Sequence, residues 1–282
     1  MSRVAYVNGR YLPHRDAHVH IEDRGYQFAD GIYEVIAVRG GRLIDELPHL
    51  DRLDRSLGEM RLAPPMARSP LQQAMREVLR RNRVADGIVY LQVSRGVAPR
   101  SHAFPKGARP ALVITARRMQ PNFAQMEKGI AVVTLPDIRW KRRDIKTVNL
   151  TANVLAKQQA LDAGAYDAWL VDDDGMISEG TASNAWIVTK GKELVTHTPD
   201  YRILNGITRL SVRALAEKEG YRFAERPFSK AEALAATEAF ITGTTSWVTP
   251  VIAIDGKPVG DGKPGPLTKA LQRLYAEHAD RP

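Results

Sequence analysis

Short segments rich in β-forming residues alternate with segments of helical periodicity along this chain, and that alternation restricts its fold more than any other feature. Strands are predicted at 32–39, 88–94, 111–116, 130–135, 166–171, 185–189, 239–242 and 248–254. Helices are predicted at 50–60, 69–81, 152–163, 208–219 and 267–277. Helices interspersed with many short strands are typical of the mixed α/β class.

Local signals near the N-terminus add detail to this pattern. Asn8-Gly9 lies between two short β-rich segments and predicts a hairpin with a type I′ turn. Apolar and polar residues alternate over 17–21, which predicts a further strand. Ser69, followed by Pro70, predicts the start of a helix with the serine as its cap.

A polar, proline-containing stretch at 117–123 (RRMQPNF) separates two blocks of the chain. We therefore expect an N-terminal α/β domain at 1–117, a linker at 118–123 and a larger C-terminal domain at 124–282. A length of 282 residues is sufficient for two domains of moderate size, each with its own core.

Composition excludes several classes of protein. The sequence contains no cysteine, so disulfide scaffolds, thiolate zinc sites and cysteine nucleophiles are excluded. No apolar run approaches the roughly 20 residues that span a bilayer, and the first residues show no signal-peptide pattern. We therefore expect a cytoplasmic protein with no membrane partner.

The net charge of +9 is compatible with nucleic acid, with an anionic small substrate, or with a merely basic surface. Basic residues cluster at 76–83 and at 139–146. Neither cluster is accompanied by a zinc finger, an RNP pattern or a basic leucine zipper, so we expect no nucleic-acid partner. The helical spacing of the first cluster predicts a solvent-exposed face.

Two candidate binding motifs are not supported by the residues around them. Gly260, Gly262 and Gly265 match the G-x-G-x-x-G string, but flanking prolines and the missing βαβ unit favour a surface turn before the last helix. His18 and His20 would share one face of a strand. No nearby carboxylate has a convincing ligand spacing, so we expect no metal site.

Several residues together match the needs of one cofactor. Lys146 lies among apolar and amide neighbours, where desolvation would lower its pKa and allow a Schiff base. The segment 206–208 opens a helix and would offer amides and a hydroxyl to an anion, as would the turn at 243–245. The Arg52 guanidinium would donate two hydrogen bonds to the same anion, and the Glu179 carboxylate could pair with a ring nitrogen. Pyridoxal phosphate requires such a set.

Each of these features also has an ordinary interpretation. A lysine is more often a surface residue, a threonine at a helix start is usually a cap, and a glutamate in a turn is usually solvated. Spacing alone does not show that the residues converge.

Four longer segments carry a resemblance that covers the chain from about Tyr6 to Leu274. They are DRGYQFADGIYE at 23–34, RGVAPRSHAFP at 95–105, DIRWKRRDIKTVNL at 137–150 and TEAFITGTTSWVTPVIAIDGK at 237–257. On these segments the sequence resembles the class IV pyridoxal-phosphate aminotransferases, and among them the D-amino acid aminotransferases.

The resemblance implies a role for each candidate residue. Lys146 would form the Schiff base and move a proton during the reaction, and Glu179 would keep the pyridine nitrogen protonated. The residues that would bind the cofactor phosphate, or lie in the same two turns, are Arg52, Gly206, Ile207, Thr208, Thr244 and Thr245. Leu204 would support the ring face. The residues that would trap the substrate α-carboxylate are Tyr33, Arg100 and His102.

The pair Arg100 and His102 implies the stereochemistry of the substrate. In this family such an R-x-H pair accompanies D-amino acids, because the position of the carboxylate clamp decides which face of the α-carbon meets the lysine. The rival interpretations on the same scaffold are an (R)-amine transaminase, a branched-chain L-aminotransferase and aminodeoxychorismate lyase. A basic binding module without catalysis is the alternative of another class.

The resemblance also implies the architecture and the reaction. It implies a fold-type IV arrangement of two domains with the cofactor between them, barrel-like β structure in the larger C-terminal domain, and a homodimer. The implied reaction is a ping-pong transamination between D-amino acids and 2-oxo acids, such as D-alanine plus 2-oxoglutarate giving pyruvate plus D-glutamate.

Overall fold

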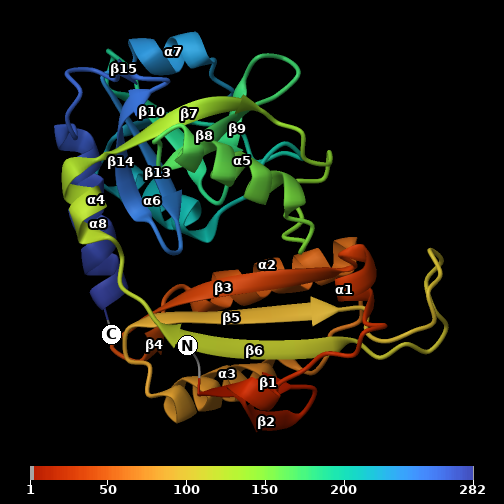
Figure 1. Cartoon of the computed structure of the whole chain (residues 1–282). Coiled ribbons are helices and arrows are strands. Elements are labelled where there is room, and N and C mark those ends of the chain that lie inside the picture. Colours follow the sequence, from red (N-terminus) through yellow and green to blue (C-terminus); the bar gives the residue numbers. More distant parts are fainter. Residues whose placement is uncertain (1–2, 282) are drawn as a thin grey trace. The chain divides into compact units, whose positions relative to one another are not determined.

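The computed structural model describes residues 3–281 and divides into two compact units (Figure 1). The first unit runs to Gln120 and includes Ile145–Asn149; the second comprises Pro121–Asp144 and the chain from Leu150 onward. The predicted domain limits place residues 145–149 in the second domain. Here they group with the first unit because they hydrogen-bond to one of its strands.

The first unit is built on an antiparallel sheet of six strands in the order β2-β1-β6-β5-β3-β4. The strands are β1 Val4–Val7, β2 Arg10–Pro13, β3 Gly31–Arg39, β4 Arg42–Leu43, β5 Gly87–Ser94 and β6 Ala111–Arg118. Asn8 and Gly9 both have positive φ angles, as the predicted turn of the first hairpin requires.

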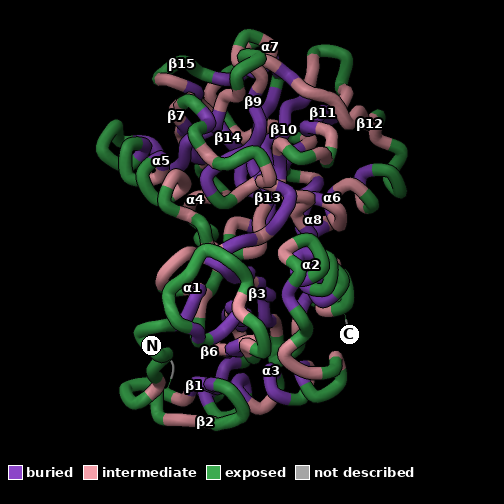
Figure 2. The backbone as a smooth tube through the Cα atoms, turned by 90° about the vertical axis from the view of Figure 1, so that its right-hand side faces the viewer, coloured by how far each residue is buried: buried purple, intermediate pink, exposed green. Residues whose placement is uncertain are grey.

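Two long helices cover this sheet, with shorter helical turns near its start. The helical segments are the 3-10 turn η1 His14–Asp16 and the helices α1 Arg24–Phe28, α2 Glu46–Glu59 and α3 Arg68–Asn82. Leu53 of α2 and Met75 of α3 share one hydrophobic core with Ile36 and Leu91 of the sheet. The strands are largely buried, whereas the outer turns of α2 are exposed (Figure 2).

The second unit contains a mixed sheet of nine strands in the order β12-β11-β10-β13-β14-β7-β8-β9, with β15 paired to β14. Its strands are β7 Ile130–Pro136, β8 Asp167–Val171, β9 Ile177–Gly180, β10 Asn184–Val188, β11 Glu193–Thr196, β12 Arg222–Glu225, β13 Glu238–Gly243, β14 Trp247–Ile254 and β15 Lys257–Pro258. β9 ends this order yet also contacts β10, so the sheet curls back on itself.

Five helices pack on this curled sheet: α4 Phe123–Lys128, α5 Thr151–Asp162, α6 Ile207–Lys218, α7 Lys230–Ala235 and α8 Pro266–Asp280. α6 and α8 contact each other and β13, while α5 covers β7 and β8. Trp169, Ile187 and Phe228 lie in the main core of the unit. The predicted mixed α/β class is therefore confirmed.

Two local predictions are wrong. Residues 17–21 form no strand, because Val19 and Ile21 are 50% and 78% exposed and find no sheet face to cover. The helix expected to have Ser69 as its cap has Ala67 in that position instead, two residues earlier. The helix begins at Arg68, and Ala67 makes no side-chain cap hydrogen bond. Proline is still accommodated, since the first-turn N–H groups need no intrahelical acceptor.

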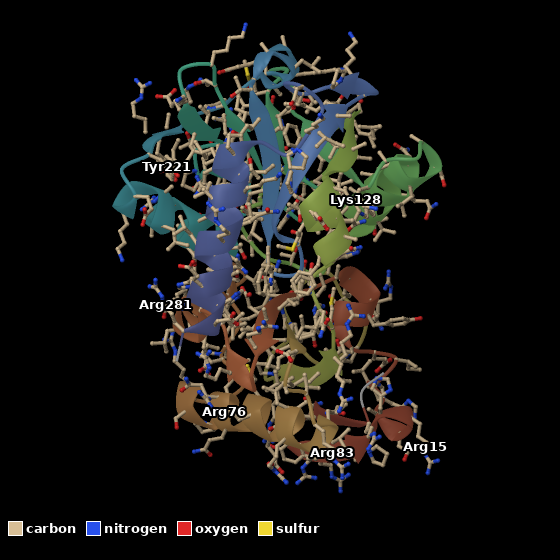
Figure 3. All side chains as sticks on the ribbon, turned by 90° about the vertical axis from the view of Figure 1, so that its left-hand side faces the viewer. Arg15, Arg76, Arg83, Lys128, Tyr221 and Arg281 are labelled. Carbon is tan, nitrogen blue, oxygen red and sulfur yellow. The ribbon has the colours of Figure 1, made fainter. Side chains whose placement is uncertain are left out.

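Two surface predictions are confirmed. The basic residues Arg76 and Arg83 lie at the outer surface of the first unit, one within α3 and one just after it (Figure 3). Gly260 and Gly262 have positive φ angles in a turn, and Gly265 directly precedes α8.

Candidate active site

Lys146 lies in the short stretch 145–149, which runs beside β3. The Tyr33 N–H donates to the Lys146 carbonyl at 2.9 Å, and the Val148 N–H donates to the Gly31 carbonyl at 3.1 Å. Its Nζ is 4.3 Å from the centroid of the Tyr33 ring. Within residues 3–281, no hydrogen bond or ion pair joins this Nζ to a carboxylate. The amine therefore rests on an aromatic face and is not neutralised by an acid.

Arg52, the predicted phosphate ligand, is fixed by a buried carboxylate that the sequence analysis missed. Glu34 is fully buried and accepts from Arg52 Nε and Nη2, each at 2.8 Å, and lies 2.9 Å from His49 Nδ1. Burial raises the pKa of Glu34, but the Arg52 charge and the hydrogen bonds of Arg52 and His49 outweigh it and lower the pKa to about 2. Burial lowers the pKa of His49.

Arg100 and His102 lie together over one aromatic ring. The Arg100 guanidinium carbon is 4.7 Å from the centroid of Phe28, and the ring centroids of His102 and Phe28 are 5.5 Å apart. Tyr33, the third member of the predicted carboxylate trap, stacks on Tyr90. In the described part of the chain, no hydrogen bond, ion pair or ring contact joins Arg100 or His102 to Tyr33 or Lys146.

In the second unit, Glu179 of β9 is buried and receives three hydrogen bonds. Arg139 Nη1 donates to Oε1 at 2.6 Å, while Asn184 Nδ2 and the Leu204 N–H donate to Oε2 at 3.0 Å and 3.1 Å. Burial raises the pKa of Glu179, and Arg139 and the Leu204 N–H do not offset it. This carboxylate is well oriented but its negative charge is incompletely compensated.

Arg139 cannot compensate Glu179 fully because a second acid occupies its fork. Arg139 Nε and Nη2 donate to the two oxygens of Asp137 at 2.9 Å and 2.7 Å. Ser178 Oγ also donates to Asp137 at 2.8 Å, and Arg143 Nε lies 3.2 Å from the same carboxylate. Burial raises the pKa of Asp137, but these partners, Arg139 first, lower it overall.

The predicted phosphate turns lie at one end of the curled sheet. Asn184 begins β10 and pairs with Thr242 of β13, so it lies beside the turn at 243–246. Asn184 also donates to the Leu204 carbonyl at 2.8 Å. A Cβ on Gly206 would meet Asn184 Oδ1 at 2.1 Å, so only glycine fits there. α6 begins at Ile207 without a side-chain cap, which leaves its first N–H groups for another acceptor.

The structure thus gathers the predicted residues into local groups. Lys146 lies with Tyr33, and Arg100 lies with His102. The largest group consists of Glu179, Leu204, Gly206, Ile207, Thr208, Thr244 and Thr245, which occur around Asn184 or in the helix start and turn next to it. Sequence reasoning missed Glu34, His49, Asp137, Arg139 and Asn184. Glu34, Asp137 and Arg139 stand inside quoted segments and His49 and Asn184 stand outside them, but no spacing rule marks any of the five as a partner.

The described residues outside these groups offer no second candidate for a catalytic or metal site. A cavity of about 860 Å³ in the second unit is lined by Lys190, Tyr221 and Glu238 among others and contains no predicted site residue. Its Glu238 carboxylate is already used, because it accepts from Thr268 of α8. No group of three or more metal-ligating side chains occurs within residues 3–281. No helix in that range is long and apolar enough to span a membrane.

Named proteins similar to this chain are aminotransferases. D-alanine aminotransferase of Bacillus licheniformis is 42% identical over 265 residues, which cover 94% of this chain and 93% of that protein. D-alanine aminotransferase of Listeria monocytogenes is 40% identical over 274 residues, covering 96% and 94%.

Solved structures agree with this similarity. The branched-chain amino acid aminotransferase of Escherichia coli superposes with a TM-score of 0.92 at 25% identity, covering 98% of this chain and 94% of that one. The T.th. branched-chain amino acid aminotransferase with pyridoxamine 5′-phosphate also gives a TM-score of 0.92 at 25% identity, covering 100% and 96%. The family model described as amino-transferase class IV matches residues 31–254. This chain therefore belongs to the class IV aminotransferase family.

Proposed function

We propose that this protein is a pyridoxal-phosphate-dependent D-amino acid aminotransferase that exchanges the amino group between D-amino acids and 2-oxo acids. D-alanine and 2-oxoglutarate would give pyruvate and D-glutamate, a balanced exchange of one amino group for one oxo group. The observation that carries the proposal is the Lys146 amine, held on the Tyr33 ring without an acidic partner, in a chain similar to D-alanine aminotransferases over nearly its full length.

The residues present fit the three chemical groups of the cofactor. Lys146 offers an amine to the aldehyde. Glu179 offers a buried carboxylate, oriented by Arg139, Asn184 and the Leu204 N–H, to which a protonated ring nitrogen would donate. The uncapped start of α6 offers the N–H groups of Ile207 and Thr208 to a phosphate. Thr244 and Thr245 would add hydroxyls from the neighbouring turn.

Three further residues support this assignment. Glu34 holds Arg52 in one orientation, so the guanidinium would meet a phosphate without first searching rotamers. Leu204 is fixed by Asn184 and by Glu179, which suits a residue that supports a ring face. When bound, the cofactor supplies an aldehyde that accepts the amino group and a ring that withdraws electrons from the adjacent carbon.

The protein's own groups perform the remaining work. Lys146 Nζ would accept and return a proton at the substrate α-carbon. Glu179 would hold the proton on the ring nitrogen. Arg100 would clamp the substrate carboxylate through two parallel hydrogen bonds, with His102 and Tyr33 completing the trap.

A homodimer forms part of the proposal. Within residues 3–281, no hydrogen bond, ion pair or ring contact joins Arg100 or His102 to Tyr33 or Lys146, although all four would act on one substrate. A second copy of the chain would supply Arg100 and His102 to the Lys146 of its neighbour. We also include a cytoplasmic location, as expected from the sequence.

The test is a half-reaction followed by absorbance. The protein loaded with pyridoxal phosphate is mixed separately with D-alanine, L-leucine and (R)-1-phenylethylamine. We expect D-alanine alone to bleach the band of the bound cofactor, and Lys146→Ala to abolish turnover. Bleaching by L-leucine instead would show a branched-chain L-aminotransferase, and bleaching only by the amine would show an (R)-amine transaminase. Protein that never binds the cofactor would overturn the enzymatic assignment.

A further inference from the structure

The segment that carries Arg100 and His102 has little backbone support of its own. Arg24 N–H donates to the Gly96 carbonyl at 2.9 Å, and Asp23 and Val97 form an isolated antiparallel bridge. Between residues 99 and 110, no backbone-to-backbone hydrogen bond occurs in the described chain. Side chains must therefore define the position of this segment.

One buried side chain reaches the centre of the segment. The Arg24 side chain is 4% exposed. Its Nη1 donates to the carbonyl of Ser101, the residue that separates Arg100 from His102. Arg24 also lies 4.8 Å from the centroid of Phe28, the ring on which Arg100 and His102 rest. Arg24 thus contacts both the backbone and the aromatic support of the predicted carboxylate trap.

The Asp30 carboxylate accepts hydrogen bonds from both Arg24 and a second arginine, Arg95. Arg24 Nε donates to Asp30 Oδ2 at 2.8 Å, and Arg95 Nε and Nη2 donate to the same carboxylate at 2.7 Å and 3.0 Å. Arg95 also donates to the carbonyls of Met60 and Arg61, at 2.8 Å and 3.0 Å. Burial raises the pKa of Asp30, but Arg95 and Arg24 outweigh it and lower the pKa overall. The acid therefore stays ionised.

Arg95 supports the far end of the segment. Its guanidinium carbon lies 3.8 Å from the centroid of Phe104, two residues beyond His102. Arg24, Arg95 and Asp30 are all at most 9% exposed at their side chains, so both arginines support the segment from the interior of the unit.

We propose that Arg24 is a positioning residue for carboxylate recognition, which holds the segment 99–105 through the Ser101 carbonyl so that Arg100 and His102 present a fixed anion trap. This inference rests on the proposed function, in which those two residues bind the substrate carboxylate. Arg24 does not touch the substrate in this scheme; it acts through the segment it holds.

The geometry provides a variant that should fold. In Arg24→Met, Asp30 keeps both hydrogen bonds from Arg95, so the buried carboxylate retains a cationic partner. Methionine also replaces the long apolar stem beside Phe28. By contrast, Asp30→Asn would leave two buried arginines facing each other, so it is unsuitable as a first test. Arg24→Lys keeps the charge but loses the fork that reaches Asp30 and Ser101 together.

The main experiment measures steady-state kinetics of the holoenzyme with D-alanine. For Arg24→Met we expect KM to rise about tenfold, because the charge-assisted hydrogen bond from Arg24 to the Ser101 carbonyl is lost. The value of kcat should change less than about twofold. Arg24→Lys should recover part of the loss. Arg61→Met is the matched control, since Arg61 also stacks on Phe104, at 5.1 Å, but is not bound to Ser101. Its KM should change less than about twofold.

A second readout does not depend on turnover. If Arg24 holds the segment, trypsin should cleave Arg24→Met holoenzyme after Arg100 or Lys106 several times faster than wild type, with the sites mapped by mass spectrometry. Arg61→Met should be cleaved at the wild-type rate. Unchanged cleavage together with unchanged KM would overturn the inference, as would a fall in kcat with KM preserved.

The double variant Arg24→Met/Arg100→Ala separates this inference from the proposed function. If Arg24 acts through the trap, its KM should lie within about twofold of that of Arg100→Ala alone. If Arg100→Ala itself leaves the KM for D-alanine unchanged, the trap of the proposed function fails, whatever the cleavage rates show. If Arg100→Ala raises KM but Arg24→Met does not, only the positioning role fails.

Discussion

Two buried glutamates, one in each unit, differ in how their charge is compensated. Glu34 on β3 is 0% exposed and Glu179 on β9 is 4% exposed, and each accepts a hydrogen bond from an arginine. Glu34 has the whole fork of Arg52 and a bond to His49, and its pKa falls to about 2. Glu179 has one nitrogen of Arg139, and its pKa is raised.

The difference lies in the second acid. Arg139 gives its fork to Asp137, so one guanidinium serves two carboxylates, whereas Arg52 serves Glu34. A buried carboxylate whose charge is compensated by side chains of its own protein serves to orient those side chains. One that is buried, oriented and short of positive charge is suited to bind a cation from outside. The comparison thus separates an acid that orients its own arginine from an acid that the proposed function assigns to the cofactor.

The largest effect should come from removing the compensated acid. Glu34→Gln removes the carboxylate charge that accepts Nε and Nη2 of the buried Arg52, and breaking a buried pair in this way costs roughly 3–5 kcal/mol of unfolding free energy. Denaturant unfolding of the cofactor-free protein measures it. Glu77→Gln is the matched control: Glu77 also has a pKa lowered to about 2 by Arg80 and Arg81, but it lies on the surface of α3, where water screens the pair. Equal losses in both variants would contradict the comparison.

A smaller effect of the same origin should appear on acidification. Because the pKa of Glu34 is lower when folded, its contribution to stability is complete above the ordinary value of 4.5 and is lost as pH falls through about 2. The shift corresponds to roughly 3 kcal/mol. The raised pKa of Glu179 has the opposite sign: its contribution is complete below the ordinary value and is lost as pH rises through the raised one.

Unfolding free energy measured against pH tests both signs in the cofactor-free protein. Glu34→Gln should flatten the acid limb of the stability profile. Glu179→Gln should leave that limb intact and remove a loss of stability on the alkaline side of the ordinary glutamate pKa. An acid limb that persists unchanged in Glu34→Gln would show that other carboxylates dominate it.

Sequence reasoning found one of these glutamates and not the other. Glu179 stands in a segment rich in Gly, Ser and Thr within a recognisable cofactor pattern, so it could be singled out from the sequence. The sequence suggested a turn there, but the residue lies in the short strand β9. Glu34 lies in an apolar strand, and its partners His49 and Arg52 come from α2; only the packing of that helix on β3 brings them together. In the sequence, Arg139 was interpreted only as part of a basic cluster. Its pairing with Glu179 could not be foreseen, because the two residues are 40 positions apart.

The secondary-structure elements also fall into those that the sequence predicts and those that it does not. Elements with long periodic patterns, such as α2, α3 and β5, were predicted within a few residues. The four-residue strands β9, β11 and β12 were not, because so short a segment shows no period of its own. The parallel pairing of β11 with β12 is fixed by the intervening helix α6, a tertiary effect that local propensity does not carry.

The third prediction concerns the under-compensated acid. Under the proposed function, Glu179→Gln would remove the counter-charge of the ring nitrogen. The dissociation constant for pyridoxal phosphate should then rise about 10- to 100-fold, because one charge-assisted hydrogen bond is lost. Absorbance titration of the cofactor-free protein measures it. Glu219→Gln, at the exposed end of α6, is the control and should bind like wild type. Unchanged binding by Glu179→Gln would mean that this carboxylate does not meet the cofactor.

The smallest effect should come from making Glu179 resemble Glu34. Asp137→Asn removes the competing negative charge, so more of the Arg139 charge acts on Glu179, and the pKa of Glu179 should fall. Infrared titration of the protonated carboxyl measures that fall. A better-compensated Glu179 attracts a cation less, so pyridoxal phosphate should bind a few-fold more weakly, less than in Glu179→Gln. Tighter binding would mean that Asp137 acts by positioning Arg139, and not by leaving Glu179 short of positive charge.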